Sequence, residues 1–114
     1  MPRRMAKMSP SAETRFLEGI AYIAERNPSA AEAIVRKMRS LRERLADFPR
    51  LGARGPIPGT RRMFINPLVL TVRETKDGAV IVAVRHAKQK DAYAPSEALE
   101  DHQQDEEDTS VLKP

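Results

Sequence analysis

The sequence FPRLGARGPIPGTRRMF, residues 48–64, marks the point at which the character of the chain changes. Pro49 can end a preceding helix. Three Gly and two further Pro between Arg50 and Thr60 favour a loop. The glycine spacing differs from that of phosphate-cradling motifs and no strand precedes it, so a nucleotide-binding loop is not predicted. The chain therefore divides here into an earlier and a later half.

The residues after this loop predict a small antiparallel sheet. A short strand over residues 62–65 is interrupted by Asn66-Pro67, because proline cannot donate to a strand ladder. Strands over residues 68–75 and 79–85 flank Lys76-Asp77-Gly78, whose Asp-Gly pair favours a hairpin turn. The last strand is continuously apolar, which is typical of a central strand covered by helices.

The residues before the loop predict a helical hairpin over residues 10–47. Ser9 or Ser11 can cap the first helix, and Asn27-Pro28 separates it from the second. Ser29, with Glu32 three residues later, resembles a capping box for the second helix. Apolar residues recur at helical spacing in both helices and are interpreted as core. They are Phe16, Leu17, Ile20, Ile23 and Ala24 in the first helix, and Ile34, Met38, Leu41 and Leu45 in the second.

Length and composition predict a single soluble domain in the cytoplasm. The 114 residues suit one domain, and the absence of Cys excludes disulfides and thiolate metal sites. The longest apolar run, residues 79–84, is too short to span a membrane, and the basic start has no apolar segment typical of a signal peptide. A metal is not expected because the only histidines are His86 and His102, and no cofactor is expected because the sequence carries no nucleotide or redox cofactor signature.

Charge is divided unevenly along the chain. Residues 1–90 carry 19 Lys and Arg against 8 Asp and Glu, a net charge of +11. Residues 91–114 carry one Lys against 8 acids, a net charge of −7. A body this basic attracts polyanions such as nucleic acid, the ribosome or an acidic protein. The alternative is that the arginine-rich helices only carry solvated faces.

The same division predicts a domain over residues 1–95 and an acidic, disordered tail over residues 96–114, with a helical turn near residues 97–100. One hypothesis is that residues 97–108 fold back onto the basic face and mask it. The alternative is a solvated tail that aids solubility.

Four short stretches resemble, in order, the RelE/ParE superfamily of toxins from type II toxin–antitoxin modules. IAYIAERNP (residues 20–28) is similar to the family's first helix, and FPRLG (residues 48–52) to its helix-to-sheet junction. PGTRRM (residues 58–63) is similar to the start of the sheet, and VRH (residues 84–86), followed by basic residues, to the last strand. The resemblance covers roughly residues 10–93.

The resemblance implies an α+β fold in which an N-terminal helical hairpin packs on a small, mostly antiparallel sheet of three to four strands. Such folds usually begin with a strand, which only Met5 to Met8 could supply here. The family commonly has a Tyr near the second strand of the sheet, where this chain has Thr71 and Val72.

The resemblance also implies a toxin neutralised by a cognate antitoxin, as a homodimer or a toxin–antitoxin hetero-oligomer. The ParE-like branch inhibits DNA gyrase and is not a nuclease, whereas the RelE-like branch cleaves mRNA on the ribosome. Residues 51–63, and the strand pair with its Arg-His end, are closer to ParE-like sequences, so gyrase inhibition is preferred. An mRNA interferase is the alternative, and an inactive or regulatory binding domain of the same fold is a third reading.

A RelE-like nuclease would need a base, an acid and cations that stabilise the phosphate. His86 could serve as acid or base, and Arg61 or Arg85 could hold the phosphate. Tyr93 could stack on a base, as the resemblance to RelE-like nucleases implies. His86 also has a structural reading as a hydrogen-bonding residue, and Tyr93 as a residue at the core edge. Arg73 can be read as an exposed strand residue or a salt-bridge partner of Glu74 or Asp77, and Arg62 as a partner of acidic residues on the first helix. Arg62, Arg73, Lys88 and Lys90 are the further candidates for target binding.

Overall fold

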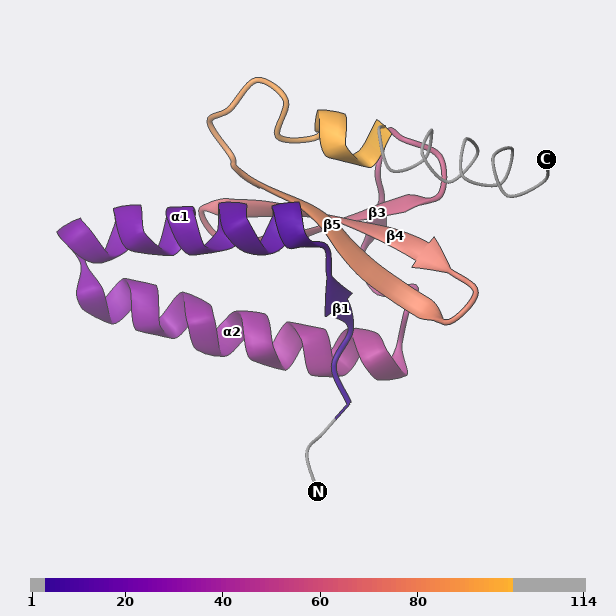
Figure 1. Ribbon diagram of the computed structural model, residues 1–114, viewed down its shortest axis with the longest axis horizontal. Helices are drawn as coiled ribbons and strands as arrows, with labels where there is room; N and C mark the ends of the chain where they lie inside the picture. Colours follow the sequence, from indigo (N-terminus) through magenta and orange to yellow (C-terminus); the bar gives the residue numbers. More distant parts are fainter. Residues whose placement is uncertain (1–3, 100–114) are drawn as a thin grey trace.

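The computed structural model describes residues 4–99, in which a helical hairpin covers one face of a five-stranded sheet (Figure 1). The strand order is β1-β5-β4-β3-β2, and every neighbouring pair is antiparallel except β1 with β5. The predicted α+β class is confirmed. The elements are β1 (Lys7–Met8), α1 (Pro10–Arg26), α2 (Pro28–Asp47), β2 (Ala53–Arg54), β3 (Thr60–Ile65), β4 (Leu68–Thr75) and β5 (Gly78–His86).

The sheet has more strands than predicted because short strands form at both edges. β1 lies within the Met5 to Met8 segment and pairs in parallel with β5. β2 forms inside the stretch that was expected to be a loop only, where Ala53 and Arg54 pair with β3. Gly52, with a φ of 94°, allows the chain to turn into β2.

A single residue, Asn27, joins the two helices. Its backbone N–H donates to the Ile23 carbonyl at 2.8 Å and ends α1. Its side-chain Oδ1 accepts from the Ala30 N–H at 3.0 Å and begins α2, with Pro28 as the first helical residue. The predicted capping box at Ser29 is therefore wrong, because Ser29 already lies inside the helix.

The residues around β1 tie both helices to the sheet. The Ala6 N–H donates to the Arg42 carbonyl at 2.9 Å, and Arg42 Nε donates to the Ala6 carbonyl at 2.8 Å. The Ser9 N–H donates to the Ile81 carbonyl at 2.9 Å, and Ser9 Oγ accepts from the Ala12 N–H at 3.2 Å. Of the two predicted caps, Ser9 is therefore the one that caps α1.

The main core lies between the helical hairpin and the first face of the sheet, the face that the helices cover. Most residues of the predicted apolar stripes pack in it, but Leu17 faces away and is 58 % exposed, and Ala24 lines a groove at the surface. Each fully buried Leu or Ile contributes about 2 kcal/mol relative to an exposed one. The larger buried residues of this core are Phe16, Ile34, Met38, Leu41, Leu45, Ile65, Leu68, Leu70, Val72, Ile81 and Val84.

The second face of the sheet is covered by the chain's own C-terminal part, which lies opposite the helices (Figure 1). Val82 and the half-buried Val80 pack there with Ile57 and Ala98. Residues 96–99 are helical, so the expected turn near residues 97–100 forms over the part that the structure describes. The remainder of the predicted tail, from residue 100, lies outside the described residues. β5 is therefore continuously apolar because both of its faces are covered.

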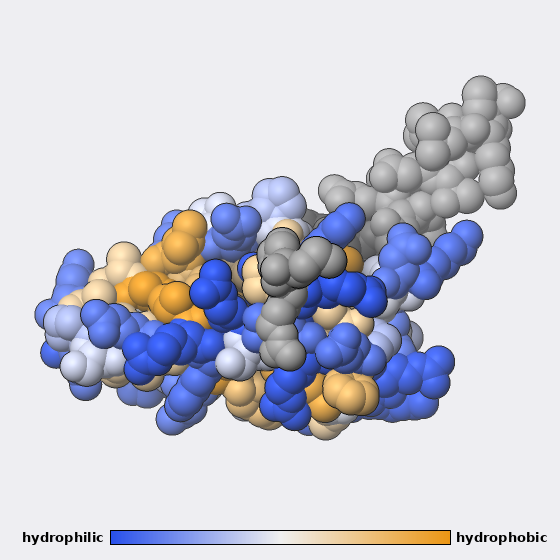
Figure 2. Space-filling model, turned by 90° about the horizontal axis from the view of Figure 1, so that it is seen from below, coloured by the Kyte–Doolittle hydropathy of each residue, from blue (hydrophilic) through white to orange (hydrophobic). Residues whose placement is uncertain are grey.

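The helical hairpin leaves apolar side chains at the surface. Figure 2 shows an apolar patch at the end of the molecule where α1 turns into α2. A groove of about 490 Å³ lies there, lined by Ile20, Ala24, Ala31 and Val35 among others. Val35 is 45 % exposed. Within residues 4–99, no helix is both long enough and apolar enough to cross a membrane.

Two glycines offer a matched test of this packing. A Cβ on Gly19, inside α1, would make only an ordinary 3.5 Å contact with Leu68 Cδ2. A Cβ on Gly52 would lie 2.8 Å from the Arg62 carbonyl and from Met63 Cγ. Gly19→Ala should therefore raise the free energy of unfolding by about 0.5–1 kcal/mol, and Gly52→Ala should lower it by at least about 1 kcal/mol. Urea denaturation checks both, and a loss of stability in Gly19→Ala would contradict the packing.

Candidate functional site

A β-bulge in β5 sets the orientation of the residues at its end. The register with β4 passes from Ala83 opposite Thr71 to Ile81 opposite Val72, so Val82 is the extra residue. Ile81 packs in the main core and, beyond the bulge, Val84 packs there too. The side chains after the bulge therefore change face.

This change of face separates two neighbouring candidate residues. Strict alternation from Ile81 would direct Arg85 toward the helices. With the bulge, Arg85 instead lies on the second face, and His86 points to the first face beside α1. The two residues that were expected to act together thus lie on opposite faces of the sheet.

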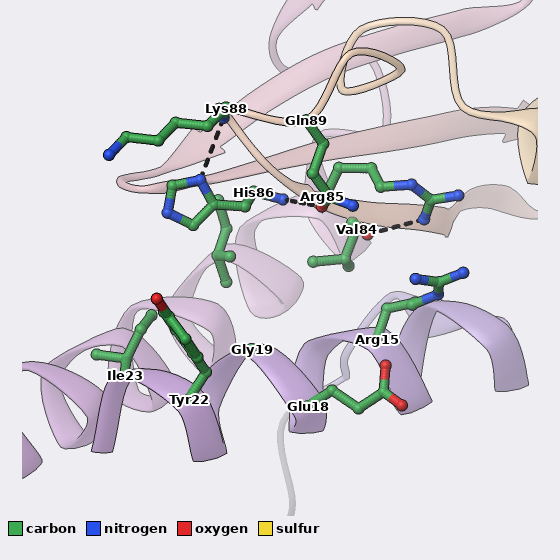
Figure 3. Close-up of a pocket in the computed structure, with 11 residues that line it drawn as sticks. Arg15, Glu18, Gly19, Tyr22, Ile23, Val84, Arg85, His86, Lys88 and Gln89 are labelled. Atoms are coloured by element: carbon green, nitrogen blue, oxygen red, sulfur yellow. Dashed lines mark hydrogen bonds between the residues drawn. The ribbon is translucent and has the colours of Figure 1, made fainter. Parts of the chain in front are cut away.

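His86 borders a pocket of about 440 Å³ between α1 and the end of β5 (Figure 3). Arg15, Glu18 and Tyr22 project from α1, and Tyr22 points toward the His86 ring across the pocket. Lys88 lines the same pocket from the β5 side. The pocket therefore combines a phenol, an imidazole, a carboxylate and the cations Arg15 and Lys88; Arg85 also borders it, although its guanidinium pairs with Glu97 and Asp91.

The hydrogen bonds of His86 restrict its chemistry. Its Nδ1 accepts from the Lys88 N–H at 3.1 Å, which places the proton of the neutral ring on Nε2. The His86 N–H donates to Gln89 Oε1 at 2.7 Å, so the main chain is fixed as well. In this tautomer Nε2 can donate a hydrogen bond, whereas action as a general acid or a general base would require Nδ1 to give up the Lys88 bond.

Arg85 is buried on the second face and fully engaged by carboxylates. Its side chain is 4 % exposed. Nη1 donates to Glu97 Oε2 at 2.6 Å, Nη2 donates to Glu97 Oε1, and Nε donates to Asp91 Oδ2 at 3.1 Å. Its hydrogen bond with Glu97, together with the charges of Glu97 and Asp91, outweighs burial and raises the pKa of Arg85 above its ordinary value.

Glu97 is the main acidic partner of this arginine, and its side chain is 12 % exposed. Burial alone would raise the pKa of Glu97. The hydrogen bonds and the positive charge of Arg85 outweigh that effect, so the pKa lies below its ordinary value of 4.5. The pair is bidentate, the strongest geometry for an arginine and a carboxylate.

Two further arginines lie on the second face, one on β3 and one on β4. The guanidinium carbon of Arg62 lies 5.1 Å from the centroid of the Tyr93 ring, within the range of a cation–π contact. The Tyr93 ring also packs against Phe64, with centroids 6.2 Å apart. Arg73 is buried and donates from Nη2 to the Ala98 carbonyl. These contacts come from the same C-terminal part that supplies Glu97.

The remaining candidates lie apart from this cluster. Arg61 lies two positions before Met63 in β3 and therefore shares the first face with it. Its Nη1 donates to the Gly52 carbonyl at 3.0 Å. Lys88 and Lys90 are exposed beyond β5. The four candidate catalytic residues are therefore divided, with Arg85 and Tyr93 on the second face and Arg61 and His86 on the first. No cluster of metal ligands occurs among residues 4–99.

Sequence reasoning missed the residues that surround these candidates. Asp91 and Glu97 were assigned only to an acidic segment and tail, and Phe64 and Tyr22 were not considered as site residues. One feature of the sequence indicates the second cover of the sheet, to which Asp91 and Glu97 belong. Six consecutive apolar residues, 79–84, require a cover on both faces, and the helices can supply only one.

The lowered pKa of Glu97 predicts a dependence of stability on pH. A carboxylate with a depressed pKa stabilises the folded state fully above its ordinary pKa of 4.5. That contribution is lost as the pH falls through the folded-state pKa. The free energy of unfolding should therefore fall between about pH 5 and pH 3 more steeply in the wild type than in Glu97→Gln. Urea denaturation across this range measures both slopes, and equal slopes would contradict the ion pair.

Comparison with known proteins identifies the family. The sequence matches the family model described as "ParE toxin of type II toxin-antitoxin system, parDE" over residues 6–91, most of the chain. A comparison with curated proteins found no match. The matched range contains the helical hairpin and all three long strands. The chain therefore belongs to the ParE toxin family of type II toxin–antitoxin systems.

Proposed function

We propose that this protein is a cytoplasmic toxin that inhibits DNA gyrase and is neutralised by its cognate antitoxin. The family implies an antitoxin as a partner. Gyrase as the target is supported by the match to ParE toxins rather than to ribosome-dependent nucleases. A toxin of this kind acts by contact with a protein and needs no catalytic residues of its own.

The observation that carries the proposal is the division of the candidate catalytic residues between two faces. RNA cleavage requires an acid, a base and phosphate-binding cations to converge on one phosphate. Here the His86 ring lies in the pocket beside α1, whereas Tyr93 lies over Arg62 on the second face. Arg85 is occupied by Glu97 and Asp91. Such an arrangement does not suit acid–base chemistry.

Exposed apolar side chains on the helical hairpin favour contact with a protein. Leu17 is 58 % exposed and Val35 is 45 % exposed, and Val35 lines the apolar groove near the α1–α2 turn. Contiguous apolar surface on a soluble protein commonly marks a protein-binding region. A nuclease that held only RNA would have little use for such a surface.

One observation favours the second candidate, an mRNA interferase. The pocket of His86 brings Tyr22, Lys88 and Arg15 around an imidazole ring whose Nε2 can donate a hydrogen bond. If the protein cleaves mRNA, this pocket is the place where the reaction would occur. His86→Ala should then reduce cleavage by about 100-fold or more, and Glu32→Ala, an exposed change on α2, should leave cleavage unchanged.

Two assays on the purified full chain separate the candidates. We expect loss of gyrase supercoiling activity and intact mRNA in a translating extract. His86→Ala should inhibit gyrase as the wild type does, because the proposed mechanism uses no proton transfer. Cleaved mRNA with unaffected supercoiling would overturn the proposal in favour of the interferase. Normal growth of cells that express the chain, with no response in either assay, would indicate a regulatory domain of the same fold.

A further inference from the structure

One residue of α1 departs from the usual preference of a helix although the packing does not require it. Gly19 lies in the interior of this 17-residue helix, where Gly is the least favourable residue apart from Pro. Among residues 4–99, positive φ angles occur only at Gly52, Gly59 and Gly78, so the backbone at position 19 does not require Gly. A Cβ there would make only an ordinary 3.5 Å contact with Leu68 Cδ2. Neither conformation nor crowding therefore explains this glycine.

Gly19 borders the His86 pocket, and the absence of a side chain keeps that pocket open. The glycine lies between Glu18 and Tyr22 along α1, with Val84 of β5 across the pocket (Figure 3). A longer side chain at this position would extend into the space of about 440 Å³. A position where helix stability is lower and a cavity stays open is typical of a binding site, because local rules are broken mainly where function requires it.

The polar groups of the pocket have unused capacity to bind a ligand. Nε2 of His86 carries the ring proton and has no acceptor among residues 4–99. The side chains of Arg15 and Glu18 form no hydrogen bond or ion pair within the same range. Lys88 is joined to His86 only through its main-chain N–H, which leaves its ammonium group without a partner there. All four groups are therefore available to a molecule that enters the pocket.

The charges that remain free in the pocket match a small monoanion. Arg15 and Lys88 each contribute a positive charge and Glu18 a negative one, while the guanidinium of Arg85 is already engaged by two carboxylates. One positive charge is left when His86 is neutral. A single carboxylate group balances that charge, whereas a phosphate dianion or a nucleic-acid strand would exceed it and would also meet the Glu18 carboxylate.

The remaining lining of the pocket suits a flat apolar body attached to this anion. Leu68 and Val84 line it beside the bare backbone of Gly19, and Tyr22 supplies an aromatic ring. The guanidinium carbon of Arg26 lies 4.3 Å from the centroid of the Tyr22 ring, a cation–π contact that holds the ring in place. The volume of about 440 Å³ lies within the range of small-molecule sites. The fitting ligand is therefore small, aromatic and singly charged.

We infer that the His86 pocket binds a small aromatic carboxylate, with its acid group at His86 and Lys88 and its ring over Gly19. This site is separate from the apolar groove near the α1–α2 turn and from the second face of the sheet. A ligand seated between α1 and β5 would join the helical hairpin to the sheet and stabilise the folded state. The inference does not depend on gyrase inhibition, because it concerns a small molecule that binds the chain itself.

Fluorine NMR on the full chain tests the inference with a matched pair of probes. They are para-fluorobenzoate and its neutral analogue para-fluorobenzamide, measured near neutral pH. The benzoate should bind with a Kd of about 1 mM, as small fragments commonly do, and the benzamide at least about fivefold more weakly. No binding of the benzoate up to about 10 mM, or equal affinities of the two probes, would overturn the inference.

Substitutions at Gly19 test occupation of the pocket without the removal of any polar group. Gly19→Leu places a side chain in the pocket and should weaken benzoate binding at least about tenfold. Gly19→Ala should weaken it less while it stabilises the fold, so that affinity and stability change in opposite directions. Unchanged affinity in Gly19→Leu would show that the ligand does not lie over this residue, and would overturn the inference.

A second pair of variants tests the role of charge. Lys88→Gln should weaken benzoate binding about two- to fivefold, the effect expected of one exposed ion pair. Lys76→Gln, at the exposed β4–β5 turn, lowers the net charge equally and should leave the affinity unchanged. Equal losses in the two variants would mean only a general attraction of anions to a basic protein, and would overturn the assignment to this pocket.

Amide chemical shifts of the wild type locate the site even if a variant fails to fold. Titration with the benzoate should move the amides of Gly19, Tyr22 and His86 most. Shifts centred on Ala24 and Val35 would place the ligand in the apolar groove and would overturn the inference. Tighter binding of a ribotrinucleotide than of the benzoate at the same amides would overturn the assignment to a carboxylate in favour of RNA. Because none of these measurements involves gyrase, their failure is distinguishable from failure of the proposed function.

Discussion

The salt bridge between Arg85 and Glu97 is the interaction on which the arrangement of the second sheet face depends. It exists because β5 contains one extra residue, Val82, that turns Arg85 away from the helices. A guanidinium directed into the main core would lie unpaired among apolar side chains, which costs several kcal/mol. On the second face the same group meets two carboxylates. The bulge thus lets one strand serve an apolar core on one side and an ionic cluster on the other.

This separation of faces also determines which groups of the molecule can act together. The first face, with the helices, carries the main core, the His86 pocket and the apolar groove, whereas the second face carries Arg62, Arg73 and Arg85 with their partners from the C-terminal part. The pocket holds a histidine whose Nε2 can donate a hydrogen bond, but the guanidinium of Arg85, which also borders the pocket, is engaged by Glu97 and Asp91. The protein therefore presents two kinds of surface for contact with other molecules, and its candidate catalytic groups do not converge. Both features are consistent with a toxin that works by binding.

The parts of the fold that depend on local patterns could be predicted from the sequence. The apolar stripes predicted the helical hairpin, and the Asp77-Gly78 turn predicted the β-hairpin of β4 and β5. Features that depend on contacts between distant residues could not be predicted. The cap of α2 is an exception among local features: it was misplaced because the backbone of Asn27 ends one helix while its side chain begins the next. The bulge at Val82 has no signature within an apolar run, so alternation alone misplaces Arg85. An acid such as Glu97 cannot be recognised as a buried partner until the chain returns across the sheet.

The most direct measurement of the central ion pair is a double-mutant cycle in the full chain. It uses Arg85→Gln, Glu97→Gln and the combination of both, with the free energy of unfolding measured by urea denaturation near neutral pH. Because the two side chains form a bidentate pair away from solvent, a coupling energy of about 1–3 kcal/mol is predicted. A coupling energy within about 0.3 kcal/mol of zero would mean that the two groups do not interact, and would contradict the proposed cover of the second face.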